Sequence, residues 1–397
     1  MKKILFIYTD KFSLYDIAWS FLELGFEMEF YEERLYTYKF EDKEPIIERL
    51  IDHLKAGNYW FVLSYNFLPS ISTACERIKI PYVGWTYDSL TLPLHSKHIL
   101  SPFNFTYVFD HSEYLIVKNR FNPPHLYYMP LAANVSRLGG TIINDDDIER
   151  LSSDISFVGN LYDTDELQDL EASGRIPAPI LDHFNYLVDY YVGHWGSESI
   201  YDCLTQEECD IINQYMPAGA NNTYDLEDRF FYAFMYIGRR IANKDRLLML
   251  QNLGNKFNVN LFGPPTELKL NVNQKGYIKY NEEFAKVAYL SKINLHLTMP
   301  RIATGISQRC FDVMASGGFL MANYKEDMLR HFEPDKDFIM YESIDELIDK
   351  CTYYLSHDDE RKKIALNGCN KVVNEHNTIL RAKEMIKNLH SEGFHEK

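Results

Sequence analysis

The chain has 397 residues, of which 46% are hydrophobic and 25% charged, and its formal net charge is −16. This length and composition are typical of a globular protein with two domains, each large enough for its own core. The negative charge argues against nucleic acid as the main partner, and no apolar run reaches the roughly 20 residues needed to span a bilayer.

Strands and helices alternate in the first 137 residues. Short apolar runs predict buried parallel strands at 3–8, 26–31, 60–64, 82–85, 105–109 and 126–129. Apolar residues at helical spacing predict helices at 13–24, 45–54 and 71–77. This alternation predicts a doubly wound, Rossmann-like α/β domain over residues 1–137.

The pattern changes after Pro130. Residues 138–154 are polar and acidic, which favours a linker or exposed loop, and Ile155–Gly159 begins a new strand. The acidic, aromatic stretch 163–228 has no clear strand signals, so we predict a mostly helical insert without assigning it a function. A helix at 230–253 and a strand at 258–263 follow.

Alternation resumes in the remaining third. We predict strands at 276–280, 293–297 and 319–323, and helices at 282–290, 343–355 and from 358 almost to the end. Residues 155–375 thus form a second Rossmann-like domain, and 376–397 a C-terminal helix that can pack back on the first. Because ligands of open α/β sheets bind at the carboxyl ends of strands, the two domains are expected to face a central cleft.

The segment KINLHLTMPRIATGISQRCFDVMASGGFL, residues 292–320, carries the strongest chemical signal. It predicts a strand, a loop ending at Gly305, and a helix that begins near Gln308 and Arg309. Backbone N–H groups at a helix start and a guanidinium suit a diphosphate. Asp312, one turn later, suits ribose hydroxyls, and Arg301 in the same loop is a further candidate for phosphate contact.

Three more candidates follow strands of the first domain. Asp88, in the segment WTYDS, is the best general base, because a carboxylate in a cleft can accept the proton of an acceptor hydroxyl. His95 lies close by as an alternative base. Asp110 either orients an acceptor or caps the helix that follows it.

Long segments of the chain resemble a known family. GYIKYNEEFAKVAYLSKINLHLT, GISQRCFDVMASGGFLMANY and YESIDELIDKCTYYLSHDDERKKIALNG resemble the CgeB/YkvP-like spore-protein glycosyltransferases. SYNFLPSISTACERIKIPYVGWTYDSLTLPLHSKHI and ISFVGNLY resemble an uncharacterised N-terminal domain that is often fused to that module. The resemblance implies a GT-B fold and sugar transfer from a nucleotide donor.

The resemblance also implies residue roles. Retaining GT-B enzymes carry a paired-glutamate motif, in which Asp312 would take the second position and Thr304, which has no charge, the first. Related enzymes hold the diphosphate with basic residues near a helix start, and the candidates here are Arg239, Lys244 and Arg246.

Two further donor contacts come from positions after strands. Gly263 either lets the backbone approach the donor or makes a plain turn, and Tyr277 is placed at the border of the nucleobase.

We therefore predict a cytoplasmic, metal-independent GT-B glycosyltransferase. Its donor is a nucleotide-diphosphate sugar, of UDP type, and its acceptor a glycan, glycolipid or glycoprotein; no other cofactor is expected, and peripheral membrane contact stays open. Asp145–Asp147 is interpreted as a solvated charge run, and the six scattered cysteines as reduced thiols rather than zinc ligands. The alternatives are a nucleotide-sugar epimerase and a non-catalytic glycan- or partner-binding protein.

Overall fold

The computed structural model describes residues 3–8, 14–33, 44–163, 171–174, 176–196, 198–215 and 226–395. The chain splits into two compact units. The first combines Met1–Asn134 with Gly219–Glu227 and His376–Lys397; the second combines Val135–Ala218 with Asp228–Glu375. None of the helices in these described ranges is both long and apolar enough to cross a membrane.

The first unit contains a six-stranded parallel sheet with the order β2-β1-β3-β4-β5-β6. Its strands are β1 (Lys3–Tyr8), β2 (Glu27–Glu32), β3 (Phe61–Tyr65), β4 (Tyr82–Trp85), β5 (Asn104–Val108) and β6 (Leu126–Tyr128). Its helices are α1 (Leu14–Glu23), α2 (Glu44–Gly57), α3 (Pro69–Ile78), η1 (Leu92–Leu94), η2 (Lys97–Leu100), α4 (His111–Phe121) and α17 (Thr378–Ser391).

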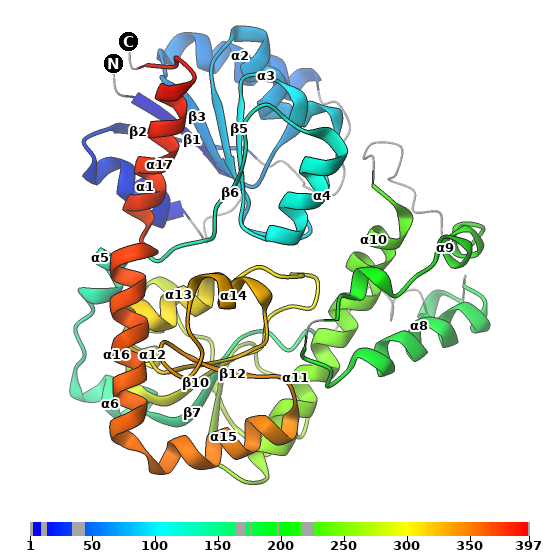
Figure 1. Ribbon diagram of the computed structural model, residues 1–397, viewed down its shortest axis with the longest axis vertical. Coiled ribbons are helices and arrows are strands. Elements are labelled where there is room, and N and C mark those ends of the chain that lie inside the picture. Colours follow the sequence, from blue (N-terminus) through cyan, green and yellow to red (C-terminus); the bar gives the residue numbers. More distant parts are fainter. Residues whose placement is uncertain are drawn as a thin grey trace. The chain divides into compact units, whose positions relative to one another are not determined.

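The C-terminal helix α17 packs on α1 in this unit, as the red and blue ribbons of Figure 1 show. The Ser20 hydroxyl lies 2.7 Å from the Thr378 hydroxyl between the two helices. Arg381 donates from Nε to the Pro130 carbonyl at 2.9 Å, so the last helix is tied to the end of the sheet by buried hydrogen bonds.

The second unit contains a second parallel sheet of six strands, in the order β12-β11-β10-β7-β8-β9. Its strands are β7 (Ser153–Val158), β8 (Val259–Phe262), β9 (Asn273–Gly276), β10 (Ser291–His296), β11 (Leu320–Asn323) and β12 (Ile339–Tyr341). Its helices are α5 (Val135–Gly139), α6 (Asp145–Leu151), α8 (Ala178–Tyr191), η3 (Ile200–Asp202), α9 (Gln206–Asn213), α10 (Asp228–Tyr232), the π-helical η5 (Ala233–Ile237), α11 (Gly238–Gly254), α12 (Tyr280–Leu290), α13 (Gln308–Ala315), α14 (Glu326–His331), α15 (Ile344–Ser356) and α16 (Asp358–Glu375).

Strand β10 shows how the sequence builds this sheet. Ile293, Leu295 and Leu297 alternate with polar residues and pack into the main core of the unit, where each buried side chain contributes about 1.5–3 kcal/mol. Asn294 lies on the opposite face and donates to the Ala288 carbonyl of α12 at 2.8 Å. The side-chain period of two residues therefore puts His296 on the face of Asn294.

The acidic stretch predicted as a linker is ordered, so that prediction is wrong for Asp145–Leu151. These residues form α6, which begins with a capping box between Asn144 and Asp147. The Asp147 carboxylate is buried and accepts from Lys286 Nζ at 2.7 Å. One member of the predicted solvated charge run is therefore a buried structural ion pair.

Two further element predictions need correction. The strand predicted at 276–280 lies earlier, at Asn273–Gly276, and α12 begins at Tyr280. The single C-terminal helix is two helices, α16 and α17. The predicted insert, 163–228, is helical at α8, η3 and α9, while residues 164–170, 175, 197 and 216–225 lie outside the described part.

Candidate functional site

The order of the second sheet marks one place for a ligand. β8 and β9 extend the sheet from β7 in one direction, and β11 and β12 extend it from β10 in the other. Where strand order reverses in this way, ligands of α/β sheets bind at the carboxyl ends of the two central strands. We use the word crevice for this region, that is, the ends of β7 and β10 and the residues that follow them. The loops that begin at Gly159 and Leu297 follow those two ends.

Gly159 and Gly263 bring the ends of β7 and β8 together. The amide of Gly159 donates to the Phe262 carbonyl at 2.9 Å. A Cβ at position 263 would lie 2.2 Å from the Gly159 carbonyl oxygen, closer than any real side chain tolerates. The glycine at 263, predicted as a donor contact or a plain turn, is thus required by the packing of two strand ends.

Arg246 of α11 contacts the backbone at both ends of the crevice. Its side chain is buried and donates to the Asn160 carbonyl and, at 3.2 Å, to the Leu297 carbonyl. It therefore joins the residues that follow β7 to those that follow β10. Its guanidinium also lies 4.6 Å from the ring of Tyr162, a geometry typical of cation–π contacts.

The pKa of Tyr162 reflects the positive charge around it. Burial by itself raises the pKa of a tyrosine. The charges of Arg246, Arg301 and Arg309 outweigh burial and hold the pKa of Tyr162 below its ordinary value. Three predicted donor residues therefore act on one phenol, in a chain whose net charge is −16.

Arg309 is the second residue of α13, at the start of the helix. Its Nη1 would lie 3.6 Å from a Cβ placed at Gly159, so the guanidinium reaches the end of β7. Its Nε is buried without a hydrogen-bond partner among the described residues. The N-cap residue Ser307 gives the first turn no side-chain cap, so the helix start offers an anion its positive end.

His296, the last residue of β10, belongs to the same crevice and was not predicted. Its side chain is 3% exposed, and neither Nδ1 nor Nε2 has a hydrogen-bond partner in the part of the chain that the structure describes. Burial, and then the charges of Arg309, Arg246 and Lys325, hold its pKa well below the ordinary value. The sequence feature that could have indicated His296 is a histidine at the end of an otherwise apolar strand, directly before the predicted loop.

The loop between β10 and α13 is held by its backbone carbonyls. The Tyr201 hydroxyl donates to the Arg301 carbonyl at 2.6 Å, and Lys325 Nζ donates to the Ile302 carbonyl at 2.6 Å. The Thr304 carbonyl accepts from the amide of Asp327 at 3.1 Å. These bonds fix the approach to Gly305, which is buried, and leave the Arg301 guanidinium 4.8 Å from the Phe234 ring.

Asp312 does not fit its predicted contact with a ribose. The side chain has no exposed surface. Its carboxylate accepts from Gln308 Nε2 at 2.8 Å and from the Tyr280 hydroxyl at 2.7 Å. Asp312 and Gln308 therefore hold the start of α13 against α12, which corrects Asp312 from a ligand contact to a support of the helix that carries Arg309.

Two other predicted donor residues differ from the arginines in their surroundings. Lys244 pairs with Asp189 of α8, its Nζ 2.5 Å from Oδ1, so it does not join the arginines. Tyr277 is 72% exposed and contributes no buried contact. Arg239 lies nearer, with its guanidinium 5.6 Å from the Tyr162 ring.

Three catalytic residues were predicted in the first unit. Asp88 is exposed, whereas His95 and Asp110 are buried. Asp88 follows β4, and Asn66, which follows β3, donates to its Oδ2 at 3.0 Å. Asn66 Oδ1 in turn accepts from the Asp88 amide at 3.1 Å. The two strand ends thus hold an accessible carboxylate in a fixed position.

His95 and Asp110 are buried, and their placement corrects both predictions. His95 is 0% exposed, with its Nε2 3.7 Å from Oε1 of Glu113, whose pKa burial raises well above the ordinary range. Asp110 accepts from the Ser112 amide at 3.0 Å and from the Ser89 hydroxyl at 2.9 Å. Neither side chain has exposed surface, and the hydrogen bonds of Asp110 make it the helix cap that the sequence also allowed.

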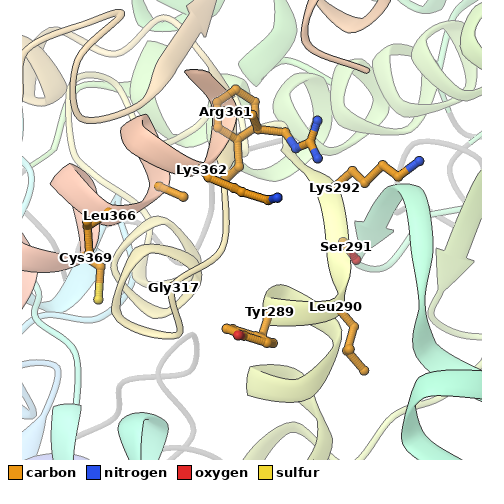
Figure 2. Close-up of a pocket in the computed structure, with 11 residues that line it drawn as sticks. Tyr289, Leu290, Ser291, Lys292, Gly317, Arg361, Lys362, Leu366 and Cys369 are labelled. Carbon is orange, nitrogen blue, oxygen red and sulfur yellow. The ribbon is translucent and has the colours of Figure 1, made fainter. Parts of the chain in front are cut away.

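A different cavity, of about 470 Å³, lies at the opposite, amino-terminal edge of the second sheet. Figure 2 shows Tyr289, Lys292 and Lys362 among its lining residues. Lys292 is paired with Asp154 at 2.7 Å. The cavity contains none of the predicted donor residues, so the size of a hollow does not by itself locate the site.

Comparisons with known proteins agree with this architecture. A family model described as glycosyl transferase-like matches residues 240–387. Among solved structures, Anabaena Alr3699/HepE in complex with UDP-glucose aligns at 11% identity over 98% of this chain and 99% of its own, with a TM-score of 0.54. Sucrose-phosphate synthase (tll1590) from Thermosynechococcus elongatus aligns at 10% identity over 98% and 100%, with a TM-score of 0.52. No curated protein matches the chain.

The predicted fold is therefore confirmed: the chain has the two Rossmann-like units of the GT-B architecture. The predicted enzyme class is confirmed by the glycosyl transferase-like domain, which contains α11, β10 and α13 and so most of the crevice described above.

Proposed function

We propose that this protein transfers a sugar from a nucleotide-diphosphate donor to a carbohydrate-bearing acceptor. The observation that carries the proposal is the group of cations at the carboxyl ends of β7 and β10. Arg246, Arg301 and Arg309 all act on Tyr162, and buried N–H groups of Arg246 and Arg309 have no partner among the described residues. Such a group suits an anion with several oxygens.

Arg309 and the start of α13 are assigned to the diphosphate. When the bond between the sugar and the diphosphate breaks, negative charge grows on the leaving oxygen. Preorganised cations and backbone dipoles stabilise that charge without reorganisation, and this is often the largest contribution to such a reaction. Arg246 supports the same region by fixing the carbonyls on both sides of the crevice.

We further propose that no metal ion is needed, because the arginines supply the positive charge that Mg²⁺ supplies elsewhere. A UDP-type donor is favoured by the architecture shared with Alr3699/HepE, whose solved complex contains UDP-glucose. Membership of the CgeB/YkvP-like group and a cytoplasmic location complete the proposal. The six cysteines, all free in this structure, are consistent with a reducing compartment.

The acceptor is assigned to the first unit, with Asp88 as the base if the reaction inverts the anomeric centre. Asp88 is exposed and positioned by Asn66, as proton transfer from an acceptor hydroxyl requires.

The non-catalytic alternative has one specific observation in its favour. Thr304 stands where retaining relatives place a glutamate, so the charge that would contact the donor sugar is missing.

The experiment is a thermal-shift screen of the pure protein with UDP, GDP, dTDP, CMP and their common sugars, in the presence of a chelator. A ligand that binds only the folded protein raises the melting temperature by mass action. The expected result is a shift with one nucleotide diphosphate, followed by its release from the nucleotide sugar only when a glycan acceptor is added. Release without transfer would favour hydrolysis, and binding without turnover the non-catalytic alternative. No shift with any nucleotide would contradict the proposed donor site.

A further inference from the structure

The imidazole of His296 is buried. Hydrogen bonding satisfies nearly all buried polar atoms in folded proteins. Here both ring nitrogens are buried without a partner among the described residues. The backbone of the same residue is fixed, since its carbonyl accepts from the Tyr341 hydroxyl at 2.9 Å. The backbone at the end of β10 is thus held in place, while the two ring nitrogens of His296 make no hydrogen bond to the described residues.

Among the described residues, the charged groups that act on this imidazole are cations. Arg309 comes from α13, Arg246 from α11, and Lys325 from the residue before α14. Burial and these three charges disfavour the imidazolium, so the free protein holds His296 neutral. The imidazole is placed on the face of β10 that Asn294 shares with α12, and Arg309 reaches the neighbouring strand end.

We infer that His296 is a ligand of the donor diphosphate and that it takes up a proton when the donor binds. The inference rests on the proposed function. A bound diphosphate brings negative charge that offsets the three cations, and its oxygens accept hydrogen bonds from a ring that makes none to the described residues. Both changes favour the imidazolium, which donates to a phosphate oxygen. The proton comes from the buffer and returns to it when the nucleoside diphosphate leaves.

The test is titration calorimetry of UDP into the protein near pH 7, in several buffers that differ in ionisation enthalpy. The slope of the observed enthalpy against that ionisation enthalpy counts the protons taken up. His296→Asn keeps a hydrogen-bonding side chain but cannot ionise. The difference in proton count between wild type and H296N cancels any ionisation of UDP itself. We expect the wild type to take up as much as about one proton more per UDP than H296N does.

His357→Asn is the matched control, since His357 is an exposed histidine of the same unit that stacks on Tyr353. It should give the wild-type proton count. Equal proton counts for wild type and H296N, with UDP bound by both, would overturn the inference and leave the proposed function standing. If UDP, GDP and dTDP all fail to bind the wild type, the proposed function fails and the inference with it.

A second measurement needs no folded variant. In the wild type, the histidine carbon resonances can be followed against pH with and without UDP. The inference predicts one imidazole that stays neutral across the range near neutrality in the free protein and becomes protonated in the complex. Titration curves that UDP leaves unchanged would overturn it.

Discussion

Replacing Gly263 by alanine tests the geometry of the crevice. The new Cβ would lie 2.2 Å from the Gly159 carbonyl oxygen and 3.2 Å from its carbonyl carbon. The ends of β7 and β8 must then separate by roughly 1 Å, an overpacking that costs about 1–3 kcal/mol. The 2.9 Å hydrogen bond from Gly159 to Phe262 would be stretched, at a further cost of about 0.5–1.5 kcal/mol.

Together these losses amount to about 1.5–4.5 kcal/mol of unfolding free energy. At about 2–4 °C per kcal/mol for a unit of this size, they lower Tm by roughly 3–18 °C. Calorimetric melting of Gly263→Ala and of Gly139→Ala measures the effect. A Cβ at Gly139 meets nothing within 4 Å, so that variant should melt like wild type. The displacement also carries Gly159 away from Arg309, so UDP affinity should fall in G263A. A G263A protein with the melting temperature of G139A and unchanged UDP affinity would refute the reasoning.

Three further predictions follow from individual contacts. Tyr280→Phe removes the hydroxyl bound to the buried Asp312 carboxylate, and should lower the unfolding free energy by about 1–3 kcal/mol in denaturant melts, while the exposed Tyr289→Phe should not. Burial raises the pKa of Asp245 to about 6, above its unfolded value of 3.8, so ionisation of this carboxyl destabilises the folded protein above pH 6. Relative to Asp245→Asn, wild type should therefore gain stability as pH falls from about 6 toward 4. A stability difference that does not change with pH would contradict this. Asp88→Asn should lower kcat by about 10²- to 10⁴-fold in a nucleotide-release assay without changing donor affinity, and unchanged turnover would remove Asp88 as the base.

The sequence predicted the sheets well, because buried parallel strands are short, continuous apolar runs between glycines and polar loops. The strand ending at His296 and the helix start at Arg309 were both located from such signals. The position of Arg309 in the crevice followed from the same pattern. Its neighbour Arg246 lies 63 positions earlier in the chain, and the family resemblance, rather than any local pattern, pointed to it.

The sequence could not show which polar groups are buried. Asp110 caps α4, where an acid stabilises the helix whether or not a ligand is near, and Asp312 lies one turn after the start of α13, where the sequence does not show what its carboxylate contacts. Tertiary packing decides between these roles, and it places a hydroxyl from α12 on Asp312. Lys244 likewise finds its partner 55 positions away, on α8. The surroundings of His296 likewise depend on tertiary packing, since the cations that act on its imidazole come from α11, α13 and the residue before α14.

The central claim is that the donor diphosphate binds at the carboxyl ends of β7 and β10. The most direct measurement is the calorimetric affinity of UDP for wild type, Arg309→Ala and Lys362→Ala. Loss of a charge-assisted contact of about 1.5–3 kcal/mol predicts a Kd about 10- to 150-fold weaker for R309A. K362A removes a positive charge at the opposite edge of the same sheet and should bind like wild type. Equal affinity of wild type and R309A, or weaker binding in K362A alone, would contradict the account.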